Sequence, residues 1–451
     1  MTMSKLPLLE KNAYLSLVIK DNGLWAHLAY TDYNASREYI LADFTDLHPL
    51  RHRLDDEVFT KEFWYNYFDN LERVFSWNIV DRDKNSIFTF RKFKNEGDGV
   101  NGIRIQIDDN QKFFDKIFSS IRNFSRDISL RVVDDRYMQE ILEELIDKGE
   151  YEDIMYVDMD LVDFSVFRVR KIYDKKEKAE KKAFSRAKIS WKNDLSLIDS
   201  IKDSRFKAFL ATDLSQKEMF NYWSNFVLNR VLFSEDPNIL DVLRSYSTIQ
   251  SHSLFRDNKE KLEGFGISGK ESCLIISGYI PQVLGKSKTL LTLIDGLELE
   301  GSFDCTWDLD MRLLSYGKSY VHATRSEDII LTSRAMHPSF TEIIIPRHKF
   351  TTQNKVIFNG KIESIGQEEK EVFAVSCKFN YVDLPDQERF VMSGVFKDGF
   401  KIPPERGSGI EFVSSKEGKR YESVLIDVRP RPIVYGPDSY SNKSKLQNWL
   451  Q

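Results

Sequence analysis

Two short apolar segments far apart in the chain constrain its fold most. The first segment, Ile154–Val169, runs as a strand to Asp158, turns, and resumes as an alternating strand. The second, Cys273–Ile276, is continuously apolar and ends at Ser277-Gly278, before a stretch with helical spacing. Short apolar runs bounded by turn residues are typical of strands that are covered on both faces of a sheet. The pattern therefore predicts an α/β fold with Ile154, Tyr156, Ile275 and Ile276 in central buried strands.

The rest of the chain predicts a repeated order of elements. Three short strands separated by turn residues open it, which indicates an antiparallel meander. Further strands and helices follow up to the Asp158 hairpin. The expected strands are 14–19, 24–30, 38–44, 86–93, 102–107 and 128–133, and the expected helices are 59–75, 110–124 and 137–146. Beyond residue 330 the texture changes to β-type runs separated by Gly, Pro and Asp, which favours a mostly antiparallel β domain.

The Asp158 hairpin resembles the second phosphate loop of the actin-like superfamily, which includes actin, sugar kinases and heat-shock chaperones. The segment from Cys273 through Gly278 resembles the adenosine-binding segment of that superfamily, and Asp308 to Gly317 resembles its closing helix. The resemblance spans about residues 13–320. It implies two ribonuclease-H-like, actin-type halves, at 13–170 and 171–320, the second with a helical insertion. A β-rich domain at 330–430 and an extended tail with a short helix at 431–451 are expected to follow. The chain of 451 residues is also longer than one hydrophobic core usually organises, which predicts two or three domains.

The positions where this resemblance implies phosphate chemistry are mostly altered. In the first hairpin, Val18 stands about where the family has an acid and Lys20 about where it has a glycine. Asp21 and Gly23 lie at the turn and restore both residue types in a different spacing. In the second loop Asp158 matches the family's acid, but Asp160, Leu161 and Val162 replace the glycine-rich turn, and these would repel or obstruct a triphosphate. Gly278 fits the adenosine segment, where Tyr279 replaces a second glycine.

Two functions follow from the resemblance. The first is a non-catalytic or weakly nucleotide-binding scaffold, similar to the cell-division, pilus-assembly and glutamate-mutase-accessory-like members, with no cofactor and a vestigial nucleotide cleft at Asp21, Gly23, Asp158 and Gly278. The alternative is an active ATPase or kinase in which Asp158 and Asp21 hold Mg²⁺ and ATP. For Asp158 a solvated turn carboxylate, and for Gly278 close packing of a strand on a helix, are the structural alternatives.

Other patterns give weaker signals. Gly264–Lys270 matches a phosphate-binding loop, but it precedes a strand instead of following one, and Glu271 stands where a hydroxyl residue would bind Mg²⁺, so a turn is predicted. His48 and His52 are separated by a proline, and no third ligand indicates a metal site. The charged stretch 171–182 mixes Glu and Lys, which favours a solvated segment over a nucleic-acid site.

Composition limits the location and the partners. A formal charge of −5 gives no general attraction to nucleic acid, and three dispersed cysteines predict reduced packing residues. We expect a cytoplasmic protein without membrane insertion. The proline-rich segment before the end should run extended. We expect a protein partner to bind the β domain and this tail, with Trp449 and Leu450 as anchors, and packing of the tail on its own body as the alternative.

Overall fold

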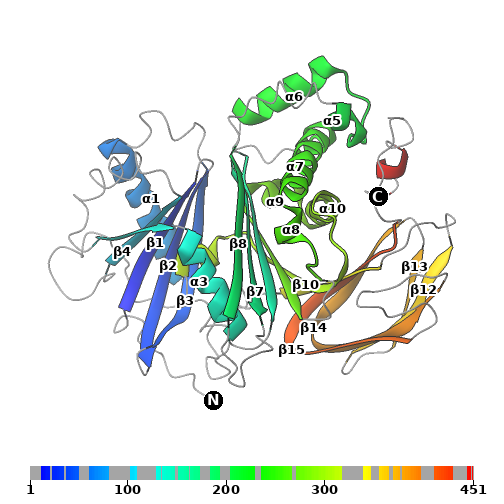
Figure 1. The fold of residues 1–451 in the computed structure, drawn as a ribbon. Helices are drawn as coiled ribbons and strands as arrows, with labels where there is room; N and C mark the ends of the chain where they lie inside the picture. Colours follow the sequence, from blue (N-terminus) through cyan, green and yellow to red (C-terminus); the bar gives the residue numbers. More distant parts are fainter. Residues whose placement is uncertain are drawn as a thin grey trace. The chain divides into compact units, whose positions relative to one another are not determined.

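A computed structural model gives the fold of the chain (Figure 1). It describes the residues 12–20, 23–34, 37–49, 60–80, 102–108, 128–133, 135–147, 151–161, 163–172, 183–192, 204–228, 235–266, 271–316, 339–346, 355–364, 369–375, 378–397, 411–429, 444–447 and 449. Two compact units divide the chain. The first comprises 1–144, 228–231 and 310–337, and the second comprises 145–227, 232–309 and 338–451.

The first unit contains a five-stranded sheet in the order β3-β2-β1-β4-β5. Its strands are β1 (Asn12–Lys20), β2 (Gly23–Asn34), β3 (Arg37–Pro49), β4 (Gly102–Asp108) and β5 (Ile128–Val133). The first three strands pair antiparallel, and β4 and β5 are added in parallel on the other side of β1. The turn residues between the apolar runs therefore produce the predicted meander. The expected elements at 86–93 and 110–124 lie outside the described residues.

Three helices contribute to the first unit: α1 (Lys61–Val80), α3 (Asp135–Asp147), whose last three residues fall in the second unit, and α11 (Arg312–Tyr316). Helix α1 begins after Thr60, whose hydroxyl accepts a hydrogen bond of 3.1 Å from the N–H of Phe63. Helix α11 comes much later in the chain but belongs to the first unit. The hydroxyl of Ser16 in β1 donates a hydrogen bond of 3.1 Å to the carbonyl oxygen of Ser315 in α11.

The second unit contains a ten-stranded sheet in the order β13-β12-β14-β15-β11-β10-β9-β6-β7-β8. Its strands are β6 (Asp153–Met159), β7 (Asp163–Ile172), β8 (Ala183–Lys192), β9 (Ser272–Ser277), β10 (Gly301–Asp308), β11 (Ser339–Ile345), β12 (Val356–Ser364), β13 (Lys370–Val375), β14 (Phe379–Phe396) and β15 (Glu411–Asp427). Strands β6, β7 and β8 form an antiparallel meander, and β9 and β10 are added in parallel beside β6. This repeats the arrangement of the first sheet.

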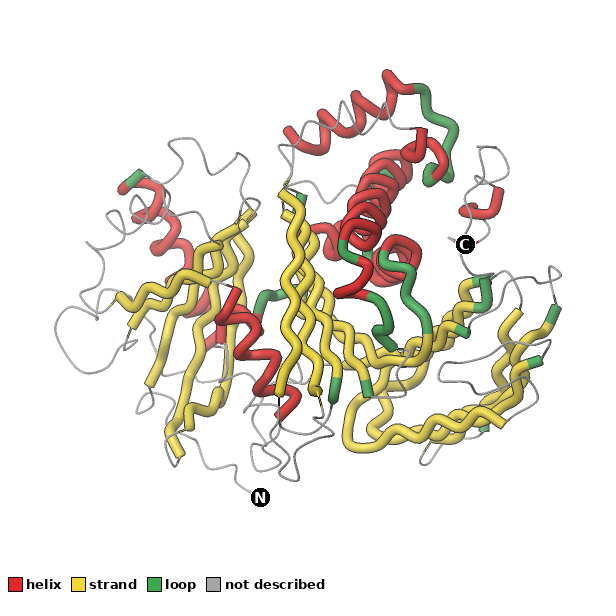
Figure 2. The backbone as a smooth tube through the Cα atoms, in the orientation of Figure 1, coloured by secondary structure: helices red, strands yellow, loops and turns green. Residues whose placement is uncertain are grey.

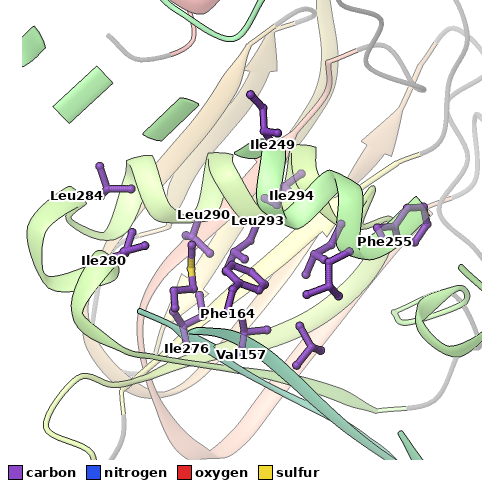
Figure 3. Packing of buried hydrophobic residues seen from close by; sticks show 14 of the residues in the cluster. Val157, Phe164, Ile249, Phe255, Ile276, Ile280, Leu284, Leu290, Leu293 and Ile294 are labelled. Atoms are coloured by element: carbon purple, nitrogen blue, oxygen red, sulfur yellow. The ribbon is translucent and has the colours of Figure 1, made fainter. Parts of the chain in front are cut away.

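A helical layer covers one face of this sheet (red in Figure 2). Its helices are α5 (Ser204–Ala208), α6 (Gln216–Leu228), α7 (Pro237–Asp257), α8 (Lys259–Leu262), α9 (Tyr279–Leu284) and α10 (Lys286–Gly296). Val157 and Phe164 of the sheet belong to one buried apolar cluster with Ile249 of α7 and with Leu290 and Leu293 of α10 (Figure 3). The four side chains predicted to lie in central strands are all buried: Ile154, Tyr156, Ile275 and Ile276. The apolar runs thus form the centre of the sheet as predicted.

The contact between α7 and α10 depends on small residues. A Cβ atom added at Gly296 of α10 would lie 2.2 Å from the Cβ of Ser251 in α7. Ser251 itself donates its hydroxyl to the carbonyl oxygen of Ser247, at 2.7 Å. A polar side chain that bonds to its own helix needs no other partner. Most residues of α7 are buried, and several of them are polar. Because Ser251 bonds within its own helix, the two helices can still approach closely.

The sheet pairing places the division between the two parts earlier than residue 170. Strand β6 pairs with β9, and β7 pairs with β6, so the Asp158 hairpin opens the second sheet and does not close the first. Residue 170 falls inside β7. A local pattern of strands and turns is the same in either assignment, because only the long-range pairing with β9 shows to which sheet the hairpin belongs.

The β-rich segment after residue 330 does not form a separate sheet. Strand β11 pairs antiparallel with β10, and β15 pairs in parallel with β11, so the segment extends the second sheet. Buried polar contacts join the two parts: Tyr421 of β15 and Tyr151 both donate hydrogen bonds to Oδ2 of Asp304 in β10, at 2.9 and 3.0 Å. Burial also raises the pKa of both tyrosines, which keeps them as donors. The other pairings of the segment are antiparallel, as predicted.

Among the helices in the described part of the chain, none combines the length and the apolar character that crossing a membrane requires.

Candidate functional site

The carboxyl ends of three parallel strands in the second sheet carry polar residues in one row. Strand pairing sets Asp158 of β6 opposite Ser277 of β9, and Ser277 opposite Asp308 of β10. Ser277 is fully buried, and its hydroxyl donates a hydrogen bond of 2.9 Å to the carbonyl oxygen of Asp308. Asp158 is half-buried. Because ligands of α/β sheets bind outside the carboxyl ends of the strands, we take Asp158, Ser277 and Asp308, the polar row, as the candidate site.

Gly278 lies directly beside the polar row and is required there by packing. Its φ is +107°, a conformation that residues with a Cβ atom rarely adopt. A Cβ atom at this position would lie 2.4 to 2.6 Å from the backbone N, C and O of Met159. The start of α9 is therefore in contact with the end of β6. The structure brings Asp158 and Gly278 together, as the resemblance implies, and the packing alternative accounts for this glycine.

The side chain of Asp160 ties the turn between β6 and β7 to the start of α9. Oδ1 of Asp160 accepts a hydrogen bond of 2.9 Å from the backbone N–H of Tyr279, the first residue of α9. The N–H of Asp160 donates to the carbonyl oxygen of Asp163, also at 2.9 Å. Asp160 and Leu161 are both buried, while Val162 lies outside the described residues. The turn thus presents a carboxylate where a glycine-rich loop would present N–H groups.

The first hairpin shows less of the site that the resemblance implies. Gly23 begins β2, is buried, and pairs with Lys20 of β1 and Pro49 of β3. Val18 and Lys20, the residues that stand for the family's acid and glycine, are buried at 2% and 5% exposure. Asp21 lies outside the described residues. Gly23 therefore belongs to the sheet of the first unit, and its part in a nucleotide site stays a prediction.

The polar row has the chemistry of a magnesium site that is completed by a ligand. Mg²⁺ prefers oxygen ligands, keeps several waters, and is commonly held by one or two carboxylates together with substrate phosphates. Neighbouring strands lie about 4.8 Å apart, so the Cα atoms of Asp158 and Asp308, on either side of Ser277 in β9, are about 10 Å apart. The carboxylate oxygens of Asp158 and Asp308 are of the ligand type that suits a hydrated Mg²⁺ ion. Within the described ranges no group of three or more His, Cys, Asp or Glu residues is placed to hold a metal ion.

The sequence predicted only part of this site. Asp158 and Gly278 were expected from the resemblance, whereas the pairing of Ser277 with Asp308 depends on the register of three strands. A signal did exist for Ser277, which follows an apolar run at the end of an expected strand, whereas Asp308 was expected to begin a helix and instead ends β10. The predicted turn at Gly264 is confirmed, because Gly264 and Gly266 have φ of +81° and +74° and precede β9.

The C-terminal helical residues pack on the second unit itself. The ring of Trp449 lies 4.8 Å from the guanidinium carbon of Arg429. Arg429 is fully buried and forms ion pairs with Asp427 at 2.6 Å and Asp295 at 2.8 Å. Leu446 is buried as well. The packing alternative therefore accounts for Trp449, while Leu450 lies outside the described residues and its role as an anchor stays a prediction.

Comparisons with known proteins give structural likenesses at low sequence identity and low TM-score. No protein-family model matches the chain, and no curated protein matches it. A Ppx/GppA family member from Aquifex aeolicus is 9% identical, with a TM-score of 0.27 over 59% of this chain, which spans just under two thirds (66%) of that protein. An exopolyphosphatase from Cytophaga hutchinsonii is 13% identical, with a TM-score of 0.29 over 71% of this chain and 83% of that one.

A non-polymerisable mutant of pCBH ParM is 11% identical, with a TM-score of 0.32 over 69% of this chain and 98% of that one. The TM-scores of these likenesses are low, and the strand order itself defines the fold. The chain is a mixed α/β protein, and both of its sheets combine an antiparallel meander with two parallel strands beside the first strand. Two repeated units of this kind are what the resemblance to the actin-like superfamily implies for the fold, and membership of that superfamily stays a prediction.

Proposed function

We propose that the two sheets are ribonuclease-H-like halves of an actin-like protein that binds a phosphorylated ligand with Mg²⁺ at the polar row and acts on it by phosphoryl transfer or hydrolysis. The observation that carries the proposal is the register that aligns Asp158, Ser277 and Asp308 at the carboxyl ends of three parallel strands.

The roles of the residues follow from their chemistry. Asp158 is half-buried, so its carboxylate can face a ligand from the end of β6. We propose that this carboxylate holds a water ligand of Mg²⁺ or accepts the proton of an attacking hydroxyl. Asp308 supplies the second carboxylate, and the hydrogen bond from Ser277 to its carbonyl oxygen fixes the end of β10. When bound, Mg²⁺ would neutralise phosphate oxygens that two carboxylates alone would repel.

Titration of the protein with magnesium nucleotides tests the proposal. Isothermal calorimetry and thermal unfolding would use AMP, ADP and ATP with and without Mg²⁺, and phosphate release would be followed from ATP and from inorganic polyphosphate. Ligand at about 100 times its dissociation constant stabilises a protein by about 2.7 kcal/mol. We expect a Mg²⁺-dependent stabilisation that Asp158→Asn and Asp308→Asn weaken about tenfold or more.

The matched control is Asp257→Asn, which removes the same charge from a side chain that is 62% exposed and paired with Arg256. It should leave binding unchanged. The proposal fails if no nucleotide stabilises the wild-type protein, or if the control loses as much affinity as Asp158→Asn.

A scaffold without catalysis is the second candidate, favoured by a different observation. Oδ1 of Asp160 already occupies the N–H of Tyr279, so the protein's own carboxylate fills the turn. In this case the same titration gives no stabilisation with any nucleotide. The partner would bind residues 330–451, and Trp449 and Leu450 remain the proposed anchors. Capture of one partner by wild-type protein but not by Trp449→Ala would support this candidate.

A further inference from the structure

The turn that follows Asp158 bears on which ligands the polar row accepts. We propose that Asp160 is a specificity-determining residue that favours a ligand with one phosphate group over a ligand with a triphosphate. This inference rests on the proposed function, because it assigns a ligand class to the same site. It concerns a residue that the proposed chemistry does not use.

The position of Asp160 is fixed from both sides. Its Oδ1 accepts the N–H of Tyr279, and its own N–H donates to Asp163, both at 2.9 Å. Only 6% of the residue is exposed. A buried residue that is hydrogen-bonded through both its side chain and its backbone has little freedom to move away from an incoming ligand.

The surroundings of Asp160 are fixed as well. Gly278 and the backbone of Met159 approach so closely that a single Cβ atom would not fit between them. The turn and the start of α9 therefore move together or not at all, because packed interiors do not deform continuously. Asp160 consequently stays two residues beyond Asp158, at the same end of β6.

The negative charge of Asp160 then discriminates between ligands by their number of phosphate groups. Each further phosphate group of a ligand adds negative charge near the turn. Like charges repel more strongly where burial reduces screening by water. A Mg²⁺ ion held at Asp158 and Asp308 compensates one phosphate group better than three. Discrimination between related ligands often comes from such a repulsive group.

Three proteins and three ligands test this inference: the wild type, Asp160→Asn and Asp163→Asn, titrated with AMP, ADP and ATP in the presence of Mg²⁺. Asparagine keeps a carbonyl oxygen for the N–H of Tyr279 while it removes the charge. Asp163→Asn is the matched control, since its carboxylate lies three residues further and accepts the hydroxyl of Ser165 at 3.0 Å. We expect the wild type to bind AMP about tenfold more tightly than ATP.

In Asp160→Asn that ratio should fall about tenfold, and in Asp163→Asn it should stay near the wild-type value. An unchanged ratio in Asp160→Asn, or an equal change in the control, overturns the inference while Mg²⁺-dependent binding still supports the proposed function. If neither the wild type nor Asp160→Asn binds any nucleotide, both proposals fall. Asp160→Ser provides a second neutral acceptor should Asp160→Asn not fold. If neither variant folds, Asp160 is a packing residue and the inference is wrong.

Discussion

The first sheet and strands β6 to β10 of the second share a strand order and differ in the residues at one row of strand ends. In the first sheet, Ile19 of β1 stands opposite Ile107 of β4, which stands opposite Val132 of β5. The polar row occupies the corresponding place in the second sheet, since Ile19 and Asp158 are each the last residue but one of the first strand of their meander. The arrangement of strands therefore forms with apolar residues at this row. Polar residues at a row that can also be apolar indicate a role in binding.

The largest effect is expected where buried charges close the second sheet. Arg429→Met would leave Asp295 and Asp427 as buried carboxylates without their guanidinium partner. Removing one member of a buried ion pair costs about 3–5 kcal/mol. Urea unfolding should show this loss, whereas Arg256→Met, at a side chain that is 58% exposed, should change little. Equal effects of the two substitutions would show that the Arg429 pairs contribute no more than surface pairs.

The first sheet should lose stability in acid because of His27 in β2. The pKa of His27 is lowered from 6.5 to about 3, chiefly by burial and then by the charge of Arg312, while a backbone hydrogen bond at Asp310 opposes the shift. Between these pKa values the unfolded chain binds a proton that the folded protein does not. The free energy of unfolding therefore falls as the pH drops below about 6.5, by about 3 kcal/mol at pH 4.

Urea midpoints at pH 7, 5.5 and 4 measure this effect in the wild type and in His27→Gln. The variant lacks the titrating group, so its stability should fall less steeply over the same range. The same slope in both proteins would exclude His27 as the cause.

A smaller effect is expected in the helical layer of the second sheet. Gly296→Ala places a methyl group against Ser251 and forces α10 away from α7. Overpacking of this kind typically costs about 1–3 kcal/mol. Thermal unfolding should show the loss, and Ser251→Gly in the same chain should recover part of it. If the double variant is no more stable than Gly296→Ala, the contact between the two helices is not the cause.

The smallest effect concerns the polar row itself. Ser277→Ala removes the hydroxyl that donates to the carbonyl oxygen of Asp308 and makes this row more like the apolar row of the first sheet. The loss of one such hydrogen bond costs about 1 kcal/mol. Chemical unfolding measures that loss in the free energy of unfolding. Nucleotide titration shows whether the free energy of binding falls by more than this loss. An unchanged affinity would limit the site to the two carboxylates.

Much of the fold could be predicted from local patterns. The strand predicted at 128–133 is β5, and the meander predicted at 14–44 is β1 to β3. Turn residues and apolar periodicity act within a few residues, so they are visible in the sequence. Local patterns could not show that the boundary between the two halves lies before residue 170. They also could not show that the β-rich segment extends the second sheet. Both features depend on pairing between strands far apart in the chain.

The candidate site divides in the same manner. The sequence by itself determined that Asp158 and Gly278 follow buried strands, and that a carboxylate replaces glycine at Asp160. Only the tertiary structure decided that Ser277 and Asp308 complete a row with Asp158, and that Asp160 bonds to Tyr279. The physical reason is register: hydrogen bonds between strands and the close contact at Gly278 fix which strand ends meet, and these are properties of packing that no single segment carries.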